Sequence, residues 1–227
     1  MQINILQLTE GAREAKGTTV VIDVFRAFST ACYLMAAGVE KILPVLHVEE
    51  ALQLKQRFPE AILLGERNEK KVPGFDFGNS PTHVHDKDFH GKTVIMTTSS
   101  GTKGLMSAID ADEILSGSFV NAGAIVSYIK NRNPIRVSLV CMGYEGHTPT
   151  QEDTFLAEYI RAKLLDKPVD FESMKKILRT GDGARLLDPA NNEWSPASDF
   201  DLCLDLDRFD FILKVSTENG LKYLKKC

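Results

Sequence analysis

Short runs of apolar, mostly β-branched residues recur along the chain, and segments with the apolar spacing of a helix separate them. The run Val20–Phe25 precedes a helical pattern at Ser29–Ala37, and Lys41–Leu46 precedes another at Val48–Phe58. Continuous apolar strands are typical of sheets that are buried on both faces. Strands that alternate with helices are usually parallel neighbours in one sheet. The chain is therefore expected to fold as an α/β protein.

The same alternation of apolar runs and helical patterns continues to about residue 165, and it ends after Lys167 and Pro168. We expect a three-layer α/β/α fold with a largely parallel or mixed sheet. We also expect a single domain, 1–227, in which 168–227 forms a loop-rich C-terminal region packed on the sheet. Further strands are expected at 61–65, 93–98, 113–118 and 136–142, and further helices at 121–130, 152–165 and 171–178.

Composition excludes several classes of protein. A formal net charge of -4 without a basic run disfavours nucleic acid as the main partner. No apolar stretch approaches the ~18–20 residues of a membrane span, and the first residues lack the basic segment of a signal peptide. The four cysteines are widely spaced, which is typical of a reducing compartment. We expect a cytoplasmic protein that does not bind membranes, and a homodimer is a further expectation.

Polar residues follow the predicted strands at the points where those strands end. Asp23 and Arg26 follow the first strand, and Glu66 and Arg67 follow the apolar run 61–65. Ligands of open α/β sheets bind at the carboxyl ends of the strands. The other candidates at this edge are Asn79, Ser80, Ser100, Gly101, Thr102, Glu152 and Asp153.

The candidate carboxylates suggest a divalent cation. An aspartate within Val-Val-Ile-Asp-Val is unfavourable unless it is paired or bound to metal. Mg²⁺ takes one or two carboxylates together with phosphate oxygens of a substrate. Asp23, Glu66 and Glu152 are therefore candidate Mg²⁺ ligands. A salt bridge from Asp23 to Arg26, and helix capping by Asp153, are the structural alternatives.

Anion-binding groups accompany these carboxylates. Ser100, Gly101 and Thr102 follow a strand and could direct backbone N–H groups and hydroxyls at a phosphate. No lysine of a phosphate-binding loop accompanies them, so a nucleoside triphosphate is not indicated. The same residues are also ordinary capping residues, and Arg26 and Arg67 could each form a surface ion pair instead of binding an anion.

Four segments of the chain, in matching order, resemble the 2-phosphosulfolactate phosphatase family. They are Val21–Ala27 with Ser29 and Thr30, Gly65–Arg67 with Gly74–Pro81, Thr97–Thr102, and Cys141–Gly143 with Glu152 and Asp153. The resemblance implies Mg²⁺-dependent hydrolysis of a small anionic phosphate ester, 2-phospho-3-sulfolactate, to 3-sulfolactate for coenzyme M synthesis. Phe28 stands where relatives usually carry a small hydroxyl residue, which predicts a less polar pocket.

The hypothesis that follows is metal-assisted hydrolysis of a phosphate monoester. Mg²⁺ on Asp23, Glu66 and Glu152 would orient the phosphate, and Asp153 would supply the proton of the leaving group. Attack by water and attack by Asp23 itself both remain open. A Mg²⁺-dependent isomerase or lyase, and a non-catalytic protein that binds small dianions, are the alternatives. The expected substrate-binding residues are Arg26, Arg67, Asn79, Ser80, Ser100, Gly101 and Thr102.

Overall fold

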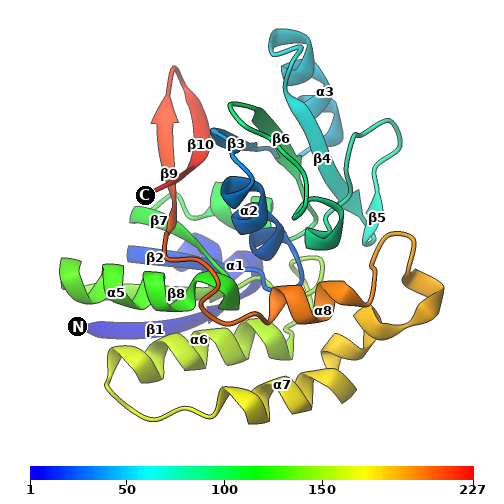
Figure 1. Ribbon diagram of the computed structural model, residues 1–227. Helices are drawn as coiled ribbons and strands as arrows, with labels where there is room; N and C mark the ends of the chain where they lie inside the picture. Colours follow the sequence, from blue (N-terminus) through cyan, green and yellow to red (C-terminus); the bar gives the residue numbers. More distant parts are fainter.

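The computed structural model describes residues 1–227, and its strands form one ten-stranded mixed sheet in the order β1-β8-β2-β7-β9-β10-β3-β6-β4-β5. Helices cover both faces of this sheet (Figure 1), so the predicted three-layer α/β class is confirmed. Two groups of parallel strands make up most of it. The first is β1 (Gln2–Gln7), β8 (Arg136–Cys141), β2 (Gly17–Ile22) and β7 (Ala111–Gly117), and the second is β3 (Lys41–Pro44), β6 (Thr93–Thr97) and β4 (Ile62–Arg67).

A C-terminal hairpin joins the two groups. β9 (Leu213–Glu218) pairs antiparallel with β7, and β10 (Leu221–Lys226) pairs antiparallel with β3. Because β9 and β10 are also antiparallel to each other, the two groups run in opposite senses along the sheet. This region was expected to pack on the sheet, whereas its last two strands enter the middle of it. The short β5 (Lys70–Lys71) pairs with β4 at the far edge.

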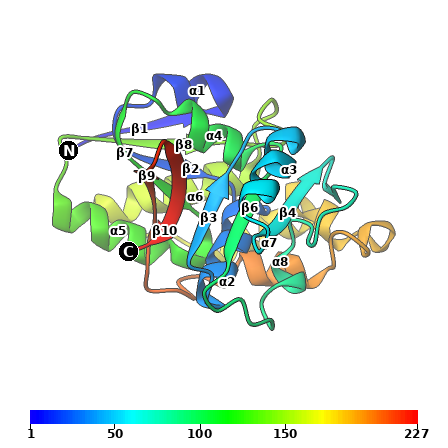
Figure 2. The ribbon, with the colours of Figure 1, turned by 90° about the horizontal axis from the view of Figure 1, so that it is seen from above.

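The helices form two outer layers and one central element. Figure 2 shows α1 and α4 on one side of the first strand group and α5 and α6 on the other. No helix is both long enough and apolar enough to cross a membrane. The helices are α1 (Leu8–Glu14), α2 (Ala27–Ala36), α3 (Val48–Arg57), α4 (Gly101–Ser107), α5 (Ala122–Arg132), α6 (Gln151–Leu164), α7 (Phe171–Thr180) and α8 (Ser198–Cys203), and the 3₁₀ turns are η1 (Pro81–His83), η2 (Phe119–Asn121), η3 (Asp182–Leu187) and η4 (Pro189–Asn191).

Helix α2 occupies the centre of the molecule, and all of its residues except the last are buried. It shares one hydrophobic core with Val21 of β2 and Val140 of β8, and also with Leu64 of β4 and Met96 of β6. One helix thus packs against both strand groups, which requires the sheet to curve around it. This curvature brings the carboxyl ends of the two groups together although the groups run in opposite senses.

Candidate active site

Asp23 follows the last residue of β2 and lies at the meeting point of the two strand groups. Its Oδ1 accepts the backbone N–H of Ala27 at 3.0 Å, at the start of α2. A Cβ at Gly101 would lie 2.9 Å from Oδ2, so only glycine lets α4 begin this close to the carboxylate. Burial, together with the charges of Glu66 and Glu152, raises the pKa of Asp23 to about 7.

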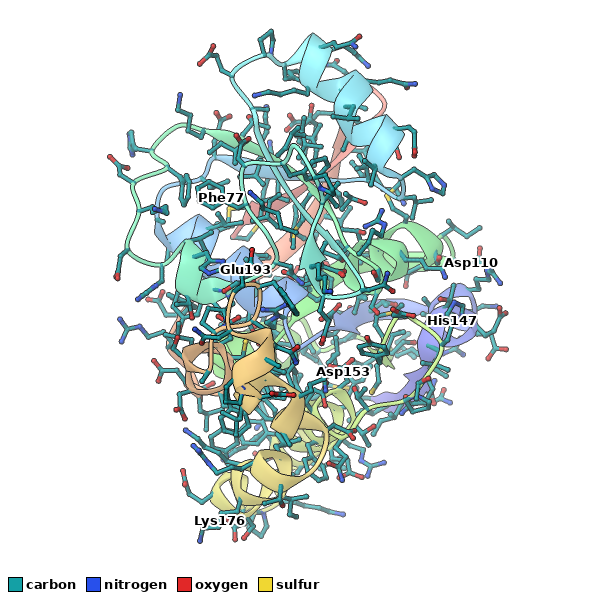
Figure 3. All side chains as sticks on the ribbon, turned by 90° about the vertical axis from the view of Figure 1, so that its right-hand side faces the viewer. Phe77, Asp110, His147, Asp153, Lys176 and Glu193 are labelled. Carbon is teal, nitrogen blue, oxygen red and sulfur yellow. The ribbon has the colours of Figure 1, made fainter.

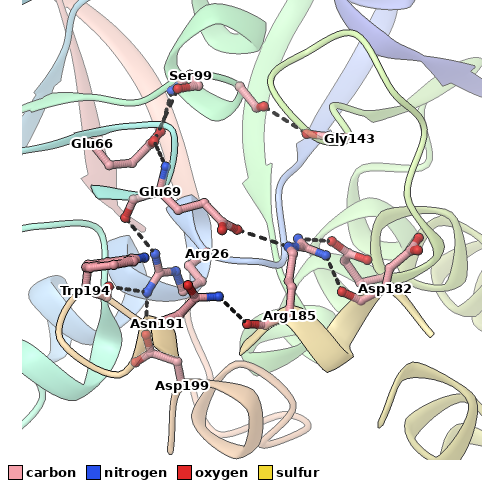
Figure 4. Close-up of polar contacts among 12 residues, drawn as sticks. Arg26, Glu66, Glu69, Ser99, Gly143, Asp182, Arg185, Asn191, Trp194 and Asp199 are labelled. Carbon is pink, nitrogen blue, oxygen red and sulfur yellow. Dashed lines mark hydrogen bonds and ion pairs between the residues drawn. The ribbon is translucent and has the colours of Figure 1, made fainter. Parts of the chain in front are cut away.

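Glu66, near the end of β4, lines the same cleft as Asp23, and Figure 4 shows its carboxylate bound by Ser99 and Glu69. Its Oε1 accepts the N–H of Ser99 at 2.6 Å, and Oε2 accepts the N–H of Glu69 at 2.9 Å. Asp23 and Glu66 line a narrow cleft of about 30 Å³, together with Asn79, Ser99, Ser100 and neighbours. The curved sheet therefore brings together carboxylates from strands of both groups.

Glu152 and Asp153 lie in the first turn of α6, and both are buried. The Oδ1 of Asp153 accepts the N–H of Val24 at 2.9 Å, and its Oδ2 accepts the N–H of Gly143 at 2.8 Å. Burial raises the pKa of Asp153 well above its usual value, and the charges of Asp23 and Glu152 act in the same direction. Asp153 thus connects the loop after β2 to the loop after β8, and it does not line the cleft.

Glu152 is bound by an arginine that the sequence analysis did not identify. Arg185 of η3 donates to Oε1 of Glu152 at 2.7 Å and to Oε1 of Glu69 at 3.1 Å (Figure 4). Burial of Arg185 disfavours its charge, but the two carboxylates outweigh this effect and raise its pKa. The other oxygen of Glu152, Oε2, is buried without a hydrogen-bond partner. Arg185 lies in a segment that was expected only to be loop-rich, and no local pattern marks it as a site residue.

Arg26 lines the cleft, but its charge is already paired. It donates to Oδ2 of Asp199 at 2.6 Å and to the carbonyl of Trp194 at 2.8 Å, so its salt bridge is with Asp199 and not with Asp23. Asp199 also accepts the hydroxyl of Ser80 at 2.8 Å. Ser80 is therefore placed behind Arg26 in a buried network, outside the lining of the cleft. The carbonyl of Trp194, which accepts from Arg26, links the C-terminal loop to this network.

Arg67 lies outside the cleft. Its guanidinium donates to the carbonyl of Leu46 at 3.0 Å and to the hydroxyl of Thr97 at 2.8 Å. Successive residues of a strand point to opposite faces, so Arg67 points away from the side on which Glu66 lies. It lines a second cavity of about 470 Å³.

Only part of the segment after β6 lines the cleft. Ser100 lines the cleft, and its hydroxyl donates to the carbonyl of Gly143 at 2.8 Å. The hydroxyl of Thr102 donates to the carbonyl of Thr98 at 3.0 Å inside the same turn, away from the cleft. The backbone N–H of Gly101 favours the charged form of Asp23. Phe28 is buried in the central core, so it does not make the cleft less polar as expected.

The oxygen ligands at this position suit a hard divalent cation. Four buried carboxylates lie near one another here, and Arg185 is paired with one of them, Glu152. The four are Asp23, Glu66, Glu152 and Asp153. Glu152 Oε2 and Asn79 Oδ1 are buried acceptors without a donor. No three His, Cys, Asp or Glu side chains are close enough to form a complete metal site alone. Mg²⁺ at this position would thus depend on water and substrate oxygens for its remaining ligands, as it commonly does.

Comparison with known proteins supports the resemblance found in the sequence. The family model described as 2-phosphosulpholactate phosphatase matches residues 3–218. A probable 2-phosphosulfolactate phosphatase of Carboxydothermus hydrogenoformans is 33% identical over 97% of this chain and 95% of its own length. A protein with the same description from Caldanaerobacter subterraneus is 34% identical over 89% of this chain and 88% of its own length. One from Thermotoga petrophila is 38% identical over 74% of this chain and 66% of its own length.

Proposed function

Because the chain belongs to the 2-phosphosulfolactate phosphatase family, we propose that it hydrolyses 2-phospho-3-sulfolactate to 3-sulfolactate and phosphate. The oxygen of water forms a bond to phosphorus, the ester P–O bond breaks, and the hydroxy-acid oxygen takes a proton. The observation that carries the proposal is the group of buried carboxylates at the junction of the two strand groups, with the unpartnered Oε2 of Glu152 among them. Burial of so much negative charge is unfavourable without a cation.

Of the three expected ligands, Asp23 and Glu66 line the cleft and would hold the cation, which we propose to be Mg²⁺, whereas Glu152 lies outside the lining. Bound there, Mg²⁺ would polarise a phosphoryl oxygen and neutralise charge that develops during transfer. The raised pKa of Asp23 supports these two ligands, because a bound cation would offset the burial and the charges of Glu66 and Glu152 that raise it.

The remaining residues of the cleft position these ligands and the substrate. Ser99 holds Glu66 through its backbone N–H and hydroxyl, and Ser100 links the segment after β6 to Gly143. Asp153, which was expected to donate the proton to the leaving group, has both oxygens engaged by backbone N–H groups. We therefore propose a positioning role for Asp153 in place of an acid role.

The two alternative functions differ in their products. An isomerase or lyase would convert a hydroxy acid without releasing phosphate, and a binding protein would not turn it over. A binding site for dianions alone is disfavoured here because like charges repel, and the cleft gathers carboxylates. A role in coenzyme M synthesis and a cytoplasmic location remain predictions.

The test is release of inorganic phosphate from 2-phospho-3-sulfolactate, 2-phospholactate and phosphoglycolate, each measured with Mg²⁺ and with EDTA. We expect Mg²⁺-dependent release that is fastest with the sulfonate. Release from the two carboxylate esters alone would retain the phosphatase and reject the sulfonate substrate. Absence of release from all three esters would reject the proposed function.

A further inference from the structure

A second cavity adjoins the cleft. We refer to it as the basic pocket, because Arg13, His47, Arg67, Lys103 and His147 contribute to its lining. It measures about 470 Å³, and it shares Ser99 and Glu145 with the cleft. The two cavities are therefore neighbours that share part of their lining.

Two positive charges in the basic pocket have no acidic partner. The guanidinium of Arg67 donates only to backbone carbonyls and to the hydroxyl of Thr97. Lys103 takes part in none of the ion pairs of the protein. Arg13 is paired with Glu10 at 2.5 Å, and Glu145 is the one acidic residue in the lining. The pocket therefore carries net positive charge beside a cleft that is rich in carboxylates.

The cleft alone cannot satisfy a substrate with several acid groups. Its volume of about 30 Å³ is smaller than a phosphorylated hydroxy acid, and its arginine, Arg26, is already bound to Asp199. Arg185 is engaged by Glu152 and Glu69. An acid group of the substrate needs a cationic or N–H partner when it leaves water. The adjoining cations without an acidic partner are Arg67 and Lys103.

We propose that the basic pocket binds the acid groups of the substrate that are remote from phosphorus, with Arg67 and Lys103 as their cationic partners. This inference rests on the proposed function, which assigns the phosphoryl group to the carboxylates of the cleft. The substrate then extends past Ser99, whose N–H is bound to Glu66 on the cleft side. Selectivity for esters that carry a second acid group arises in this pocket.

The first test measures binding without turnover, by calorimetric titration of 3-sulfolactate into the full chain. Lys103→Gln and Arg67→Gln each remove one charge, and we expect the dissociation constant to rise at least ~10-fold in each, as for other hydrogen bonds to charged groups. Lys176→Gln is the matched control, because Lys176 is exposed on α7 and lies far from His147 of the basic pocket (Figure 3). Its dissociation constant should equal that of the unaltered protein.

Absence of 3-sulfolactate binding to the unaltered protein, or equal affinity in Lys103→Gln, would overturn the subsite. The second test compares kcat/KM for 2-phospho-3-sulfolactate with kcat/KM for phenyl phosphate, which has no second acid group. Lys103→Gln should lower the ratio of the two values at least ~10-fold. An unchanged ratio contradicts the proposal. If Lys103→Gln weakens 3-sulfolactate binding but no ester releases phosphate, the subsite stands and the proposed function fails.

Discussion

Backbone N–H groups from the starts of two helices surround the carboxylate of Asp23. The N–H of Ala27 in α2 donates to it directly, and Gly101 of α4 approaches from the other side. Ala27 directly follows the turn after β2, whereas Gly101 begins the helix that follows β6 of the second strand group. The carboxylate of Asp23 therefore receives one hydrogen bond from a residue close in sequence and one from a residue that only the tertiary fold brings near.

We predict that Asp23→Asn lowers the rate of phosphate release at least ~10²-fold, the size of typical electrostatic effects at an active site. The physical reason is that the amide lacks the charge needed to hold a cation. Steady-state kinetics over a range of Mg²⁺ concentrations measure this. The control is Asp110→Asn, in an exposed residue of the turn after α4 (Figure 3). Full activity of Asp23→Asn with unaltered Mg²⁺ dependence would exclude Asp23 as a ligand.

A second prediction concerns the metal-free protein and pH. The folded-state pKa of Asp23, about 7, lies above its ordinary value of 3.8. Between these values the folded chain holds a proton that the unfolded chain releases, so the free energy of unfolding falls as pH rises from about 4 to about 7. Urea denaturation in EDTA at several pH values measures the slope. Asp23→Asn should reduce the slope without abolishing it, because the raised pKa of Asp153 acts in the same direction, and an identical slope in this variant would contradict the assignment.

At the scale of elements, η3 holds two neighbouring parts of the site through one side chain. Arg185 joins Glu152 at the start of α6 to Glu69 in the turn after β4 (Figure 4). Its guanidinium is the counter-charge of these two carboxylates, whereas Arg26 is paired with Asp199. The position of η3 therefore depends on the negative charges of Glu152 and Glu69.

Arg185→Gln should destabilise the metal-free protein by about 3 kcal/mol at neutral pH, because it leaves Glu152 buried and unpaired. This loss of stability is at the low end of the range for broken buried ion pairs, because the Arg185 side chain is 22% exposed. Urea denaturation measures the change. Arg179→Gln is the matched control, as its partner Asp201 is 60% exposed, and a loss below about 1 kcal/mol is expected there. Equal losses in the two variants would contradict the importance of the buried pair.

Most strands and helices were predicted from local patterns, with ends that differ by a few residues. The helix expected at Val48–Phe58 is α3, and the strand expected at 93–98 is β6. The C-terminal hairpin was missed, although Asn219 and Gly220, both with positive φ, are a typical two-residue hairpin turn. β10 carries three lysines and β9 is mostly polar, so the apolar pattern of a buried strand is weak there.

At the scale of the whole molecule, this hairpin is the only connection between the two strand groups within the sheet. Leu213 of β9 and Leu224 of β10 are buried in the same core as α2. The hairpin thus contributes both to the sheet and to the central core around which the sheet curves. Loss of its packing should affect the whole fold.

Leu213→Ala should lower the free energy of unfolding by about 2–5 kcal/mol, as expected for loss of a fully buried leucine. Leu52→Ala is the matched control, because Leu52 of α3 is 46% exposed. Chemical denaturation monitored by circular dichroism compares the two. If Leu213→Ala costs no more than Leu52→Ala, the hairpin does not hold the strand groups together.

Local sequence was sufficient to predict the class of fold and to single out Asp23 and Glu66, which line one cleft, because apolar runs and the polar residues that follow them are properties of neighbouring residues. Tertiary structure was needed for the pairing of charges. Arg26 meets Asp199 across 173 positions, and Arg185 meets Glu152 across 33. Glu66 and Arg67 are adjacent in sequence and still face different cavities. These outcomes depend on which face of a strand each residue occupies and on how the sheet curves around α2, which are decided by long-range packing.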